Sequence, residues 1–370
     1  MRKAWCRRPA VPLPVPHSRF GHRPLFATHW SFAIDRWSIE TVPKTYRCNI
    51  CGLTGPHPVY SAREMMLGTR EVFEYFECTG CGTVQLVEIP ANLADYYPND
   101  YYSLRALDMP PAHGLRMLLK KLRADYLLTG RGIFGRVLAK KFGYWPKYDW
   151  LRAAGARRRD AILDIGCGSG ETLLRLRDEG FTNLAGADPF IAGPLEYPGC
   201  GHSPVRVFKS AATELSGQYD LIMLDHSFEH VPNPAEVMAA VVRLLRPGGR
   251  AIIGIPVATW AWKHYRANWV ELDAPRHLFI YTPGGMELMG KRFGLAITRT
   301  IFDSSAFQFF GSEMYRRDIP LTRLRADGSR YAPPAGDFFT ESELAEFAIR
   351  ADALNRAGEG GRACFIFSRE

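Results

Sequence analysis

The sequence predicts an α/β protein whose larger part is a doubly wound parallel sheet, preceded by a small cysteine module. Two observations support this prediction. From about residue 155 onward, short apolar strand patterns alternate with patterns of helical period, which is typical of a parallel sheet covered by helices on both faces. Upstream lie two Cys-x-x-Cys pairs, Cys48 with Cys51 and Cys78 with Cys81, and such pairs predict a metal-stabilised unit.

The chain has 370 residues, of which 46% are hydrophobic and 23% charged. This length allows more than one domain, and the composition is ordinary for a globular protein. No apolar run approaches the roughly 18 to 20 residues that a membrane-spanning helix requires. The basic N-terminus continues into Pro-Leu-Pro-Val-Pro16 rather than an apolar signal core. We therefore expect a cytoplasmic protein.

The net charge of +9 is unevenly distributed along the chain. Residues 1–44 hold eight Lys/Arg and two Asp/Glu, and residues 104–147 hold ten Lys/Arg and two Asp. The rest of the chain is therefore slightly acidic, which disfavours a nucleic acid as substrate. Residues 1–44 are rich in Pro and Arg without any regular period, and we expect a disordered tail there.

Residues 45–103 form the predicted cysteine module. Each Cys pair is followed by glycine, as in a metal knuckle whose amides point at thiolate sulfurs, and 26 residues separate the pairs. Four thiolates at this spacing are typical of a zinc ribbon, and the zinc would be structural because no coordination position stays open. Iron is the main alternative metal, and two disulfides are the alternative without metal.

Two further features of this module are an expected strand over 70–77 and a run of tyrosines. The alternating pattern of the strand leads into the second Cys pair. The tyrosines could stack on a sugar or a base, or pack between modules; they are Tyr96, Tyr97, Tyr101 and Tyr102.

Residues 104–154 are expected to form a basic amphipathic helical linker, interrupted at Gly130–Gly135. Four leucines share one face of the first helix, and Lys and Arg surround them; they are Leu115, Leu118, Leu119 and Leu122. This pattern is typical of a helix that covers the sheet with a solvated basic face, or of one that contacts an anionic membrane surface. Its charge would also attract a phosphate-bearing substrate.

The expected strand Ala161–Ile165 is followed by a glycine-rich turn and a helical pattern that begins at Glu171. Glycines let the backbone bend sharply and approach a ligand at the carboxyl edge of a sheet. The turn lacks the sixth-position glycine of the dinucleotide fingerprint, and Glu171 opens the helix where a pyrophosphate would bind. A carboxylate there suits a cationic, phosphate-free ligand, so S-adenosylmethionine fits this turn better than NAD.

The turn resembles motif I of class I S-adenosylmethionine-dependent methyltransferases. Further segments resemble the family in the same order: Asn183–Pro189, Gln218–Val231, Leu244–Ile255 and Asp273–Thr282. The last is similar to a segment of the subgroup linked to bacterial polysaccharide and secondary-metabolite modification. The cysteine module resembles the small zinc module that precedes some sugar-modifying methyltransferases. The resemblance covers residues 155–370 and implies a Rossmann-like sheet of seven strands whose last strand is antiparallel.

The same resemblance implies a set of cofactor-binding residues at the carboxyl ends of the strands. Asp164 is expected to fix the turn near the cofactor amino group, Asp188 to accept hydrogen bonds from the ribose hydroxyls, and Ala211 to lie near the adenine. The full expected set is Asp164, Gly166, Cys167, Gly168, Gly170, Asp188, Ala211 and Asp225.

Methyl transfer from a sulfonium is a direct displacement that depends mainly on orientation, but a hydroxyl acceptor must also lose a proton. Candidate bases lie on loops expected to face the sulfonium: His226, Glu229, His230 and His277. We favour His230, because it directly follows the fourth strand, and then His277. Each of these side chains could instead only shape the pocket through hydrogen bonds to the loop backbone.

We therefore expect a methyltransferase with a small-molecule or glycan acceptor: a sugar nucleotide, a lipid-linked glycan or a secondary metabolite. One alternative is an RNA methyltransferase whose zinc ribbon binds the nucleic acid, but the chain lacks a base-flipping Asn-Pro-Pro-Tyr motif. The other is a non-catalytic binding module, which the intact turn from Asp164 to Gly170 disfavours. The sequence leaves the oligomeric state open.

Overall fold

The computed structural model describes residues 44–97, 107–199, 201, 204–325 and 329–369. The expected disordered tail lies outside the described residues except for Lys44, as do Tyr101 and Tyr102. All described residues belong to one compact unit. The domain boundaries expected near residues 103 and 154 remain predictions.

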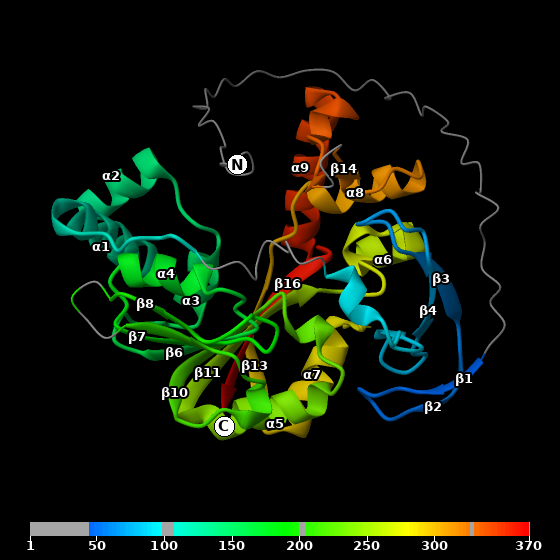
Figure 1. Ribbon diagram of the computed structural model, residues 1–370, viewed down its shortest axis with the longest axis horizontal. Coiled ribbons are helices and arrows are strands. Elements are labelled where there is room, and N and C mark those ends of the chain that lie inside the picture. The colour runs from blue at the N-terminus through cyan, green and yellow to red at the C-terminus, as the bar shows by residue number, and fades with distance from the viewer. Residues whose placement is uncertain (1–43, 98–106, 200, 202–203, 326–328, 370) are drawn as a thin grey trace, which may run out of the picture. The chain divides into compact units, whose positions relative to one another are not determined.

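The central sheet contains eight strands in the spatial order β13-β16-β11-β10-β6-β7-β9-β8 (Figure 1). Their bounds are Ala161–Ile165 (β6), Asn183–Ala187 (β7), Leu195–Tyr197 (β8), Val205–Phe208 (β9), Tyr219–Asp225 (β10), Leu245–Pro256 (β11), Leu295–Phe302 (β13) and Arg362–Arg369 (β16). The strands from β11 to β9 are parallel, and β16 is antiparallel to β11 and β13. The expected antiparallel closing strand is thus confirmed.

The expected count of seven strands is wrong, because the short strand β8 adds an eighth at one edge. It pairs antiparallel with β9. Tyr197 anchors it, since this side chain is buried and its hydroxyl donates to the Ser169 carbonyl at 2.8 Å. Glu196 and Arg206 add a cross-strand ion pair of 2.8 Å.

Side chains of the central strands alternate between the two faces of the sheet, as a two-residue period requires. Leu163 and Ile222 belong to the core on one face, with α5 and α7. Ile162 and Met223 belong to the core on the other face, with α3 and α4. The helices are Gly114–Thr129 (α1), Ile133–Phe142 (α2), Lys147–Ala153 (α3), Glu171–Asp178 (α4), Pro234–Leu244 (α5), Trp260–Tyr265 (α6), Pro283–Arg292 (α7), Phe307–Arg316 (α8) and Glu341–Ala357 (α9).

The cysteine module contains a hairpin and a small antiparallel sheet. The hairpin consists of Lys44–Arg47 (β1) and Thr54–His57 (β2), and the sheet has the order β12-β5-β4-β3. Its strands are Val59–Arg63 (β3), Val72–Glu77 (β4), Val84–Leu86 (β5) and Phe279–Ile280 (β12). The expected strand over 70–77 is confirmed as β4. Strand β12 comes from the segment 273–282, so residues far along the chain complete the sheet of the module.

The C-terminal region adds two helices to the fold. Residues 303–338 include helix α8, whose Phe309, Phe310 and Met314 are buried. Helix α9 begins with a capping box formed by Thr340 and Glu343. Among the described residues, no helix has the length and apolarity needed to cross a bilayer.

Candidate functional site

The glycine-rich turn after β6 lies against the loop that follows β10. Gly166, Gly168 and Gly170 have φ values of +73°, +55° and +88°, which glycine adopts without strain. A Cβ on Gly166 would lie 2.3 Å from the Cβ of Ser227, and Ser227 Oγ donates to the Ile165 carbonyl at 2.8 Å. Gly166 is therefore required both by its backbone conformation and by the closeness of the two loops.

Asp188 connects this turn to the end of β7. Its Oδ2 accepts a hydrogen bond from the Gly168 amide at 2.9 Å, and its Oδ1 accepts one from the Phe190 amide at 2.8 Å. The side chain of Cys167 packs over Gly186, where an added Cβ would lie 2.5 Å from the sulfur. The structure thus gives Asp188 a role in holding the turn, and its contact with ribose hydroxyls stays a prediction.

Three carboxylates gather at the carboxyl ends of β6, β7 and β10, and one lysine offsets their charge. Burial raises the pKa of Asp164 to about 7, and Asp225 and Asp188 reinforce the shift. Lys147, from α3, forms an ion pair with Asp225 and donates to Thr172 Oγ1 at 3.0 Å. Burial alone would raise the pKa of Asp225, but Lys147 outweighs it and holds that pKa below its usual range.

Ala211, the expected adenine contact, lies just after β9 at the same edge of the sheet. Its amide donates to Glu214 Oε2 at 3.0 Å, which fixes the turn. The expected residues on β6, β7, β9 and β10 therefore all lie at one edge, as the parallel order requires.

His226 begins the loop after β10, and both of its ring nitrogens are engaged. Arg362 Nη1 lies 3.2 Å from Nε2, and a guanidinium can only donate. Nε2 therefore accepts, so the ring proton is on Nδ1, which lies 3.4 Å from Glu229 Oε1. This arrangement argues against His226 as the base and in favour of a role in positioning Glu229.

His230 and His277 lie together, with ring centroids 4.7 Å apart. His230 Nδ1 is 2.8 Å from the Arg276 carbonyl and His277 Nδ1 is 2.8 Å from the Glu271 carbonyl. Because a carbonyl can only accept, each Nδ1 carries a proton, and in the neutral ring the lone pair is therefore on Nε2. Burial, reinforced by His230, lowers the pKa of His277 to about 4.

Glu229 lies beneath these two histidines and is fully buried. Its Oε1 is 3.4 Å from His226 Nδ1 and 3.8 Å from His277 Nε2, and its Oε2 has no hydrogen-bond partner among the described residues. The ligand atoms of Glu229, His230 and His277 all lie within 4.8 Å of one another. Burial opposes charge on Glu229, but His226 and the other two histidines hold its pKa below the usual range.

The cysteine module contacts this part of the site directly. The Tyr97 hydroxyl lies 3.1 Å from His230 Nδ1, and the Tyr75 hydroxyl donates to the His277 carbonyl at 2.9 Å. Arg276 is fully buried, with Nη2 2.6 Å from Asp273 Oδ1 and 3.2 Å from Glu64 Oε1. Tyr96 is buried at an edge-to-face contact with Phe73. Of the described tyrosines in the cluster, Tyr96 packs and Tyr97 reaches the candidate base.

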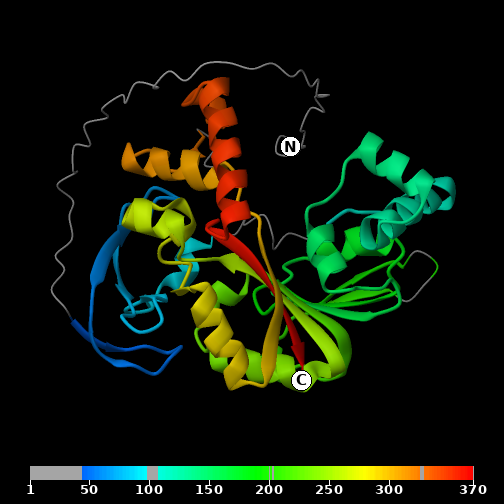
Figure 2. The same ribbon diagram turned by 180° about the vertical axis from the view of Figure 1, so that it is seen from behind.

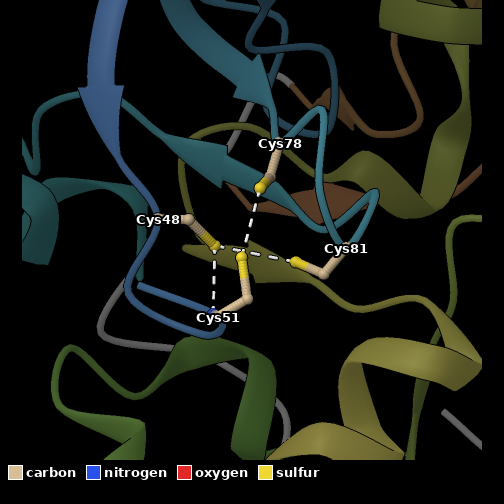
Figure 3. A group of neighbouring side chains, drawn as sticks. All are labelled: Cys48, Cys51, Cys78 and Cys81. Carbon is tan, nitrogen blue, oxygen red and sulfur yellow. Dashed lines mark hydrogen bonds between the residues drawn. The ribbon is translucent and has the colours of Figure 1, made fainter. Parts of the chain in front are cut away.

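The four cysteines of the module converge as their spacing predicts (Figure 3). All four sulfurs lie within 4.8 Å of one another, and the pairs Cys48–Cys81 and Cys51–Cys78 are 3.6 Å and 3.5 Å apart. Sulfurs that share a tetrahedral zinc at about 2.3 Å are about 3.8 Å apart, whereas disulfide sulfurs are about 2.05 Å apart. The distances therefore fit a shared metal and exclude the disulfide alternative for this geometry.

Polar hydrogens point at these sulfurs. The amides of Ile50 and Cys51 lie 3.4 Å and 3.5 Å from Cys48 Sγ, and the Gly80 amide lies 3.4 Å from Cys78 Sγ. Gln85 Nε2 donates to Cys48 Sγ at 3.1 Å. Such donors stabilise negative charge on sulfur, and Gln85 was not anticipated from the sequence.

Sequence reasoning also missed Lys147 and Arg362. Lys147 was grouped with the basic linker, although it lies just before the first strand and is the cation nearest the expected carboxylates. Arg362 lies at the start of the closing strand and pairs with Asp303 at 2.8 Å. Only the pairing of β16 with β11 brings it to His226, so no local signal could have found it.

Residues 138–300 match a family model that is described as a methyltransferase domain. A ubiquinone biosynthesis O-methyltransferase from Aeromonas salmonicida is 33% identical over 166 residues, which cover 41% of this chain and 69% of the relative. One of the same name from Dechloromonas aromatica is 29% identical over 119 residues. That match spans 29% of this chain and about half of the relative, 49%.

Among solved structures, an S-adenosylmethionine-dependent methyltransferase from Archaeoglobus fulgidus aligns with 18% identity and a TM-score of 0.37. The alignment covers 63% of this chain and 99% of that chain.

Proposed function

Because the chain belongs to the S-adenosylmethionine-dependent methyltransferases, we propose that it transfers a methyl group from this donor to a hydroxyl of a small-molecule or glycan acceptor. Sugar nucleotides, lipid-linked glycans and secondary metabolites fall in this class. The curated relatives carry the name O-methyltransferase, which supports oxygen as the methylated atom. The proposal depends above all on one observation: the end of β10 and the loop that follows it carry a buried acceptor at Asp225 and an imidazole at His230.

The residues at the glycine turn fit the donor. Asp225 Oδ1 is buried and has no hydrogen-bond partner among the described residues. Together with Asp164 and Asp188, it makes this edge of the sheet negative. The negative charge of these carboxylates and the unpaired Oδ1 of Asp225 suit a ligand that has an amino group and a positive sulfur but no phosphate. When bound, S-adenosylmethionine supplies a methyl group already activated by that sulfur; Asp188 and Asp225 would hold it.

His230 is the proposed base. Its Nδ1 proton is held by the Arg276 carbonyl, which fixes the ring and leaves Nε2 free to accept the proton of the acceptor hydroxyl. The buried carboxylate of Glu229 would stabilise the resulting imidazolium. His277, with a pKa of about 4, stays neutral and positions its neighbours.

The test is a labelled-methyl assay with the acceptor classes named above and ribosomal RNA, followed by the variant His230→Gln. We expect kcat to fall about 10²- to 10⁴-fold, with unchanged affinity for S-adenosylhomocysteine. The matched control is His113→Gln, at the exposed position just before α1. Equal kcat in both variants would exclude His230 as the base, and transfer to RNA alone would replace the acceptor class.

For the module, we propose a structural zinc bound by Cys48, Cys51, Cys78 and Cys81. The converging sulfurs and the amides directed at them support this assignment, and four thiolates leave no position for a substrate. Elemental analysis should give one zinc per chain, lost in Cys81→Ser and retained in Cys364→Ser. Cys364 is buried in the central sheet, away from the cluster. If elemental analysis finds iron instead of zinc, the identity of the metal is corrected. If it finds no metal, the proposed metal site is wrong.

A further inference from the structure

Helices α1 and α2 form a hairpin that the proposed reaction does not use. The chain reverses at Gly130–Gly132, and α1 packs against α3 and α4, whereas α2 packs against α1 (Figures 1 and 2). The contact within the hairpin is close, because a Cβ on Gly135 would lie 2.3 Å from the Leu122 carbonyl oxygen. Helix α2 therefore packs closely on α1 along the face that contains Gly135.

The surface of this hairpin is unusually apolar. Of the seventeen large apolar side chains exposed among the described residues, nine lie between Leu115 and Tyr144. Ile133 is 82% exposed and Phe134 78%, so both project from the start of α2. The others on the hairpin are Leu115, Leu118, Leu119, Leu122, Val137 and Phe142. Concentrated exposed apolar surface marks an interaction site.

The same hairpin is strongly basic. Residues 114–142 hold eight Lys/Arg and one Asp. Lys120 and Arg123 are neutralised on the side that faces α4, where they pair with Asp178 and Glu179 at 2.6 Å and 2.7 Å. The cations of α2 form no ion pair with the acidic side chains that the structure describes; they are Arg136, Lys140 and Lys141. Uncompensated positive charge thus surrounds the exposed apolar side chains.

We propose that the α1–α2 hairpin binds the surface of an anionic phospholipid bilayer. The apolar side chains would enter the boundary between headgroups and acyl chains, and the lysines and arginines would meet the lipid phosphates. A second copy fits less well, because pairing two such hairpins would bring like charges together. Nucleic acid fits less well too, because six of the eight exposed apolar side chains are Leu, Ile or Val, which do not stack on bases as the two phenylalanines could. The hairpin would lie on the membrane and not cross it.

The test uses the full zinc-loaded chain and co-sedimentation with vesicles. We expect binding to mixed phosphatidylcholine–phosphatidylglycerol vesicles, loss of that binding in high salt, and no binding to pure phosphatidylcholine. The double variant Ile133→Glu/Phe134→Glu should bind at least about tenfold more weakly, and so should Lys140→Glu/Lys141→Glu. Unchanged affinity for S-adenosylhomocysteine would show that these variants remain folded.

Matched controls come from α9, which carries Ile349 at 68% exposure and the exposed Arg356. Ile349→Glu and Arg356→Glu should bind the vesicles as the wild type does. The proposal fails if hairpin and control variants bind alike, or if both vesicle types bind equally. It also fails if light scattering shows a dimer that Phe134→Glu dissolves, or if RNA competes for the hairpin while vesicles do not bind.

Discussion

Arg276 and Glu64 form an ion pair of 3.2 Å in which both side chains are fully buried. Arg276 precedes the candidate catalytic His277, whereas Glu64 belongs to the cysteine module about 200 residues earlier. This pair therefore joins the module to the active-site loop, and its loss should affect both.

We expect Arg276→Met to lower the free energy of unfolding by about 3 to 5 kcal/mol, because it leaves the buried carboxylate of Glu64 without the cation that pairs with it. Arg63→Met is the control, since the pair between Arg63 and Asp318 is exposed and should contribute less than about 1 kcal/mol. Urea unfolding measures both. Similar losses in the two variants would argue against the role given to the buried pair.

Gly166→Ala should abolish donor binding. The added methyl group would collide with Ser227 at a residue whose φ is +73°, so the turn would have to move away from the loop after β10. Gly193→Ala is the control, because it meets nothing within 4 Å. Calorimetry with S-adenosylhomocysteine should show binding to the control only. Wild-type affinity in Gly166→Ala would remove the turn from the binding site.

Lys147→Met should bind S-adenosylmethionine about tenfold more tightly, which corresponds to about 1.4 kcal/mol. The Lys147 ammonium pairs with Asp225 and so competes with a cationic ligand for the same carboxylates. S-adenosylhomocysteine lacks the positive sulfur and should gain less. The exposed Lys263→Met on α6 provides the control. A loss of affinity in Lys147→Met would mean that this lysine binds the donor rather than competes with it.

His277 should make the folded state sensitive to acid. Its pKa falls from 6.5 to about 4 in the folded protein, so the unfolded chain binds the proton more readily. Its contribution to stability is complete above pH 6.5 and is lost as the pH falls toward about 4, by up to about 3 kcal/mol. His277→Gln should flatten the dependence of the unfolding free energy on pH in this window, whereas His113→Gln should not. An unchanged slope in His277→Gln would assign the acid sensitivity to other groups.

Residues whose positions follow from local pattern could be placed on the fold from the sequence. Asp164 is the penultimate residue of β6, Asp188 follows β7 and Asp225 ends β10, and parallel strands bring their carboxyl ends to one edge. The two Cys-x-x-Cys pairs each form a self-contained turn, so their spacing was sufficient to predict four converging sulfurs.

Residues that were missed depend on contacts between distant segments. Lys147 reaches Asp225 only because α3 packs on the sheet, and Arg362 reaches His226 only because β16 lies beside β11. The edge strand β8 has three residues, too few for a clear period, and Tyr197 stabilises it through a hydrogen bond to Ser169. Nothing in the local sequence around these residues encodes such contacts.

The pairing of β12 with β5 has a consequence for synthesis of the chain. The cysteine module leaves the ribosome about 200 residues before the strand that completes its sheet. At about 5 to 20 residues per second, the edge of β5 waits roughly 10 to 40 s for its neighbour. A nascent chain whose β5 has been synthesised but not yet paired with β12 is thus an obligatory stage of biogenesis.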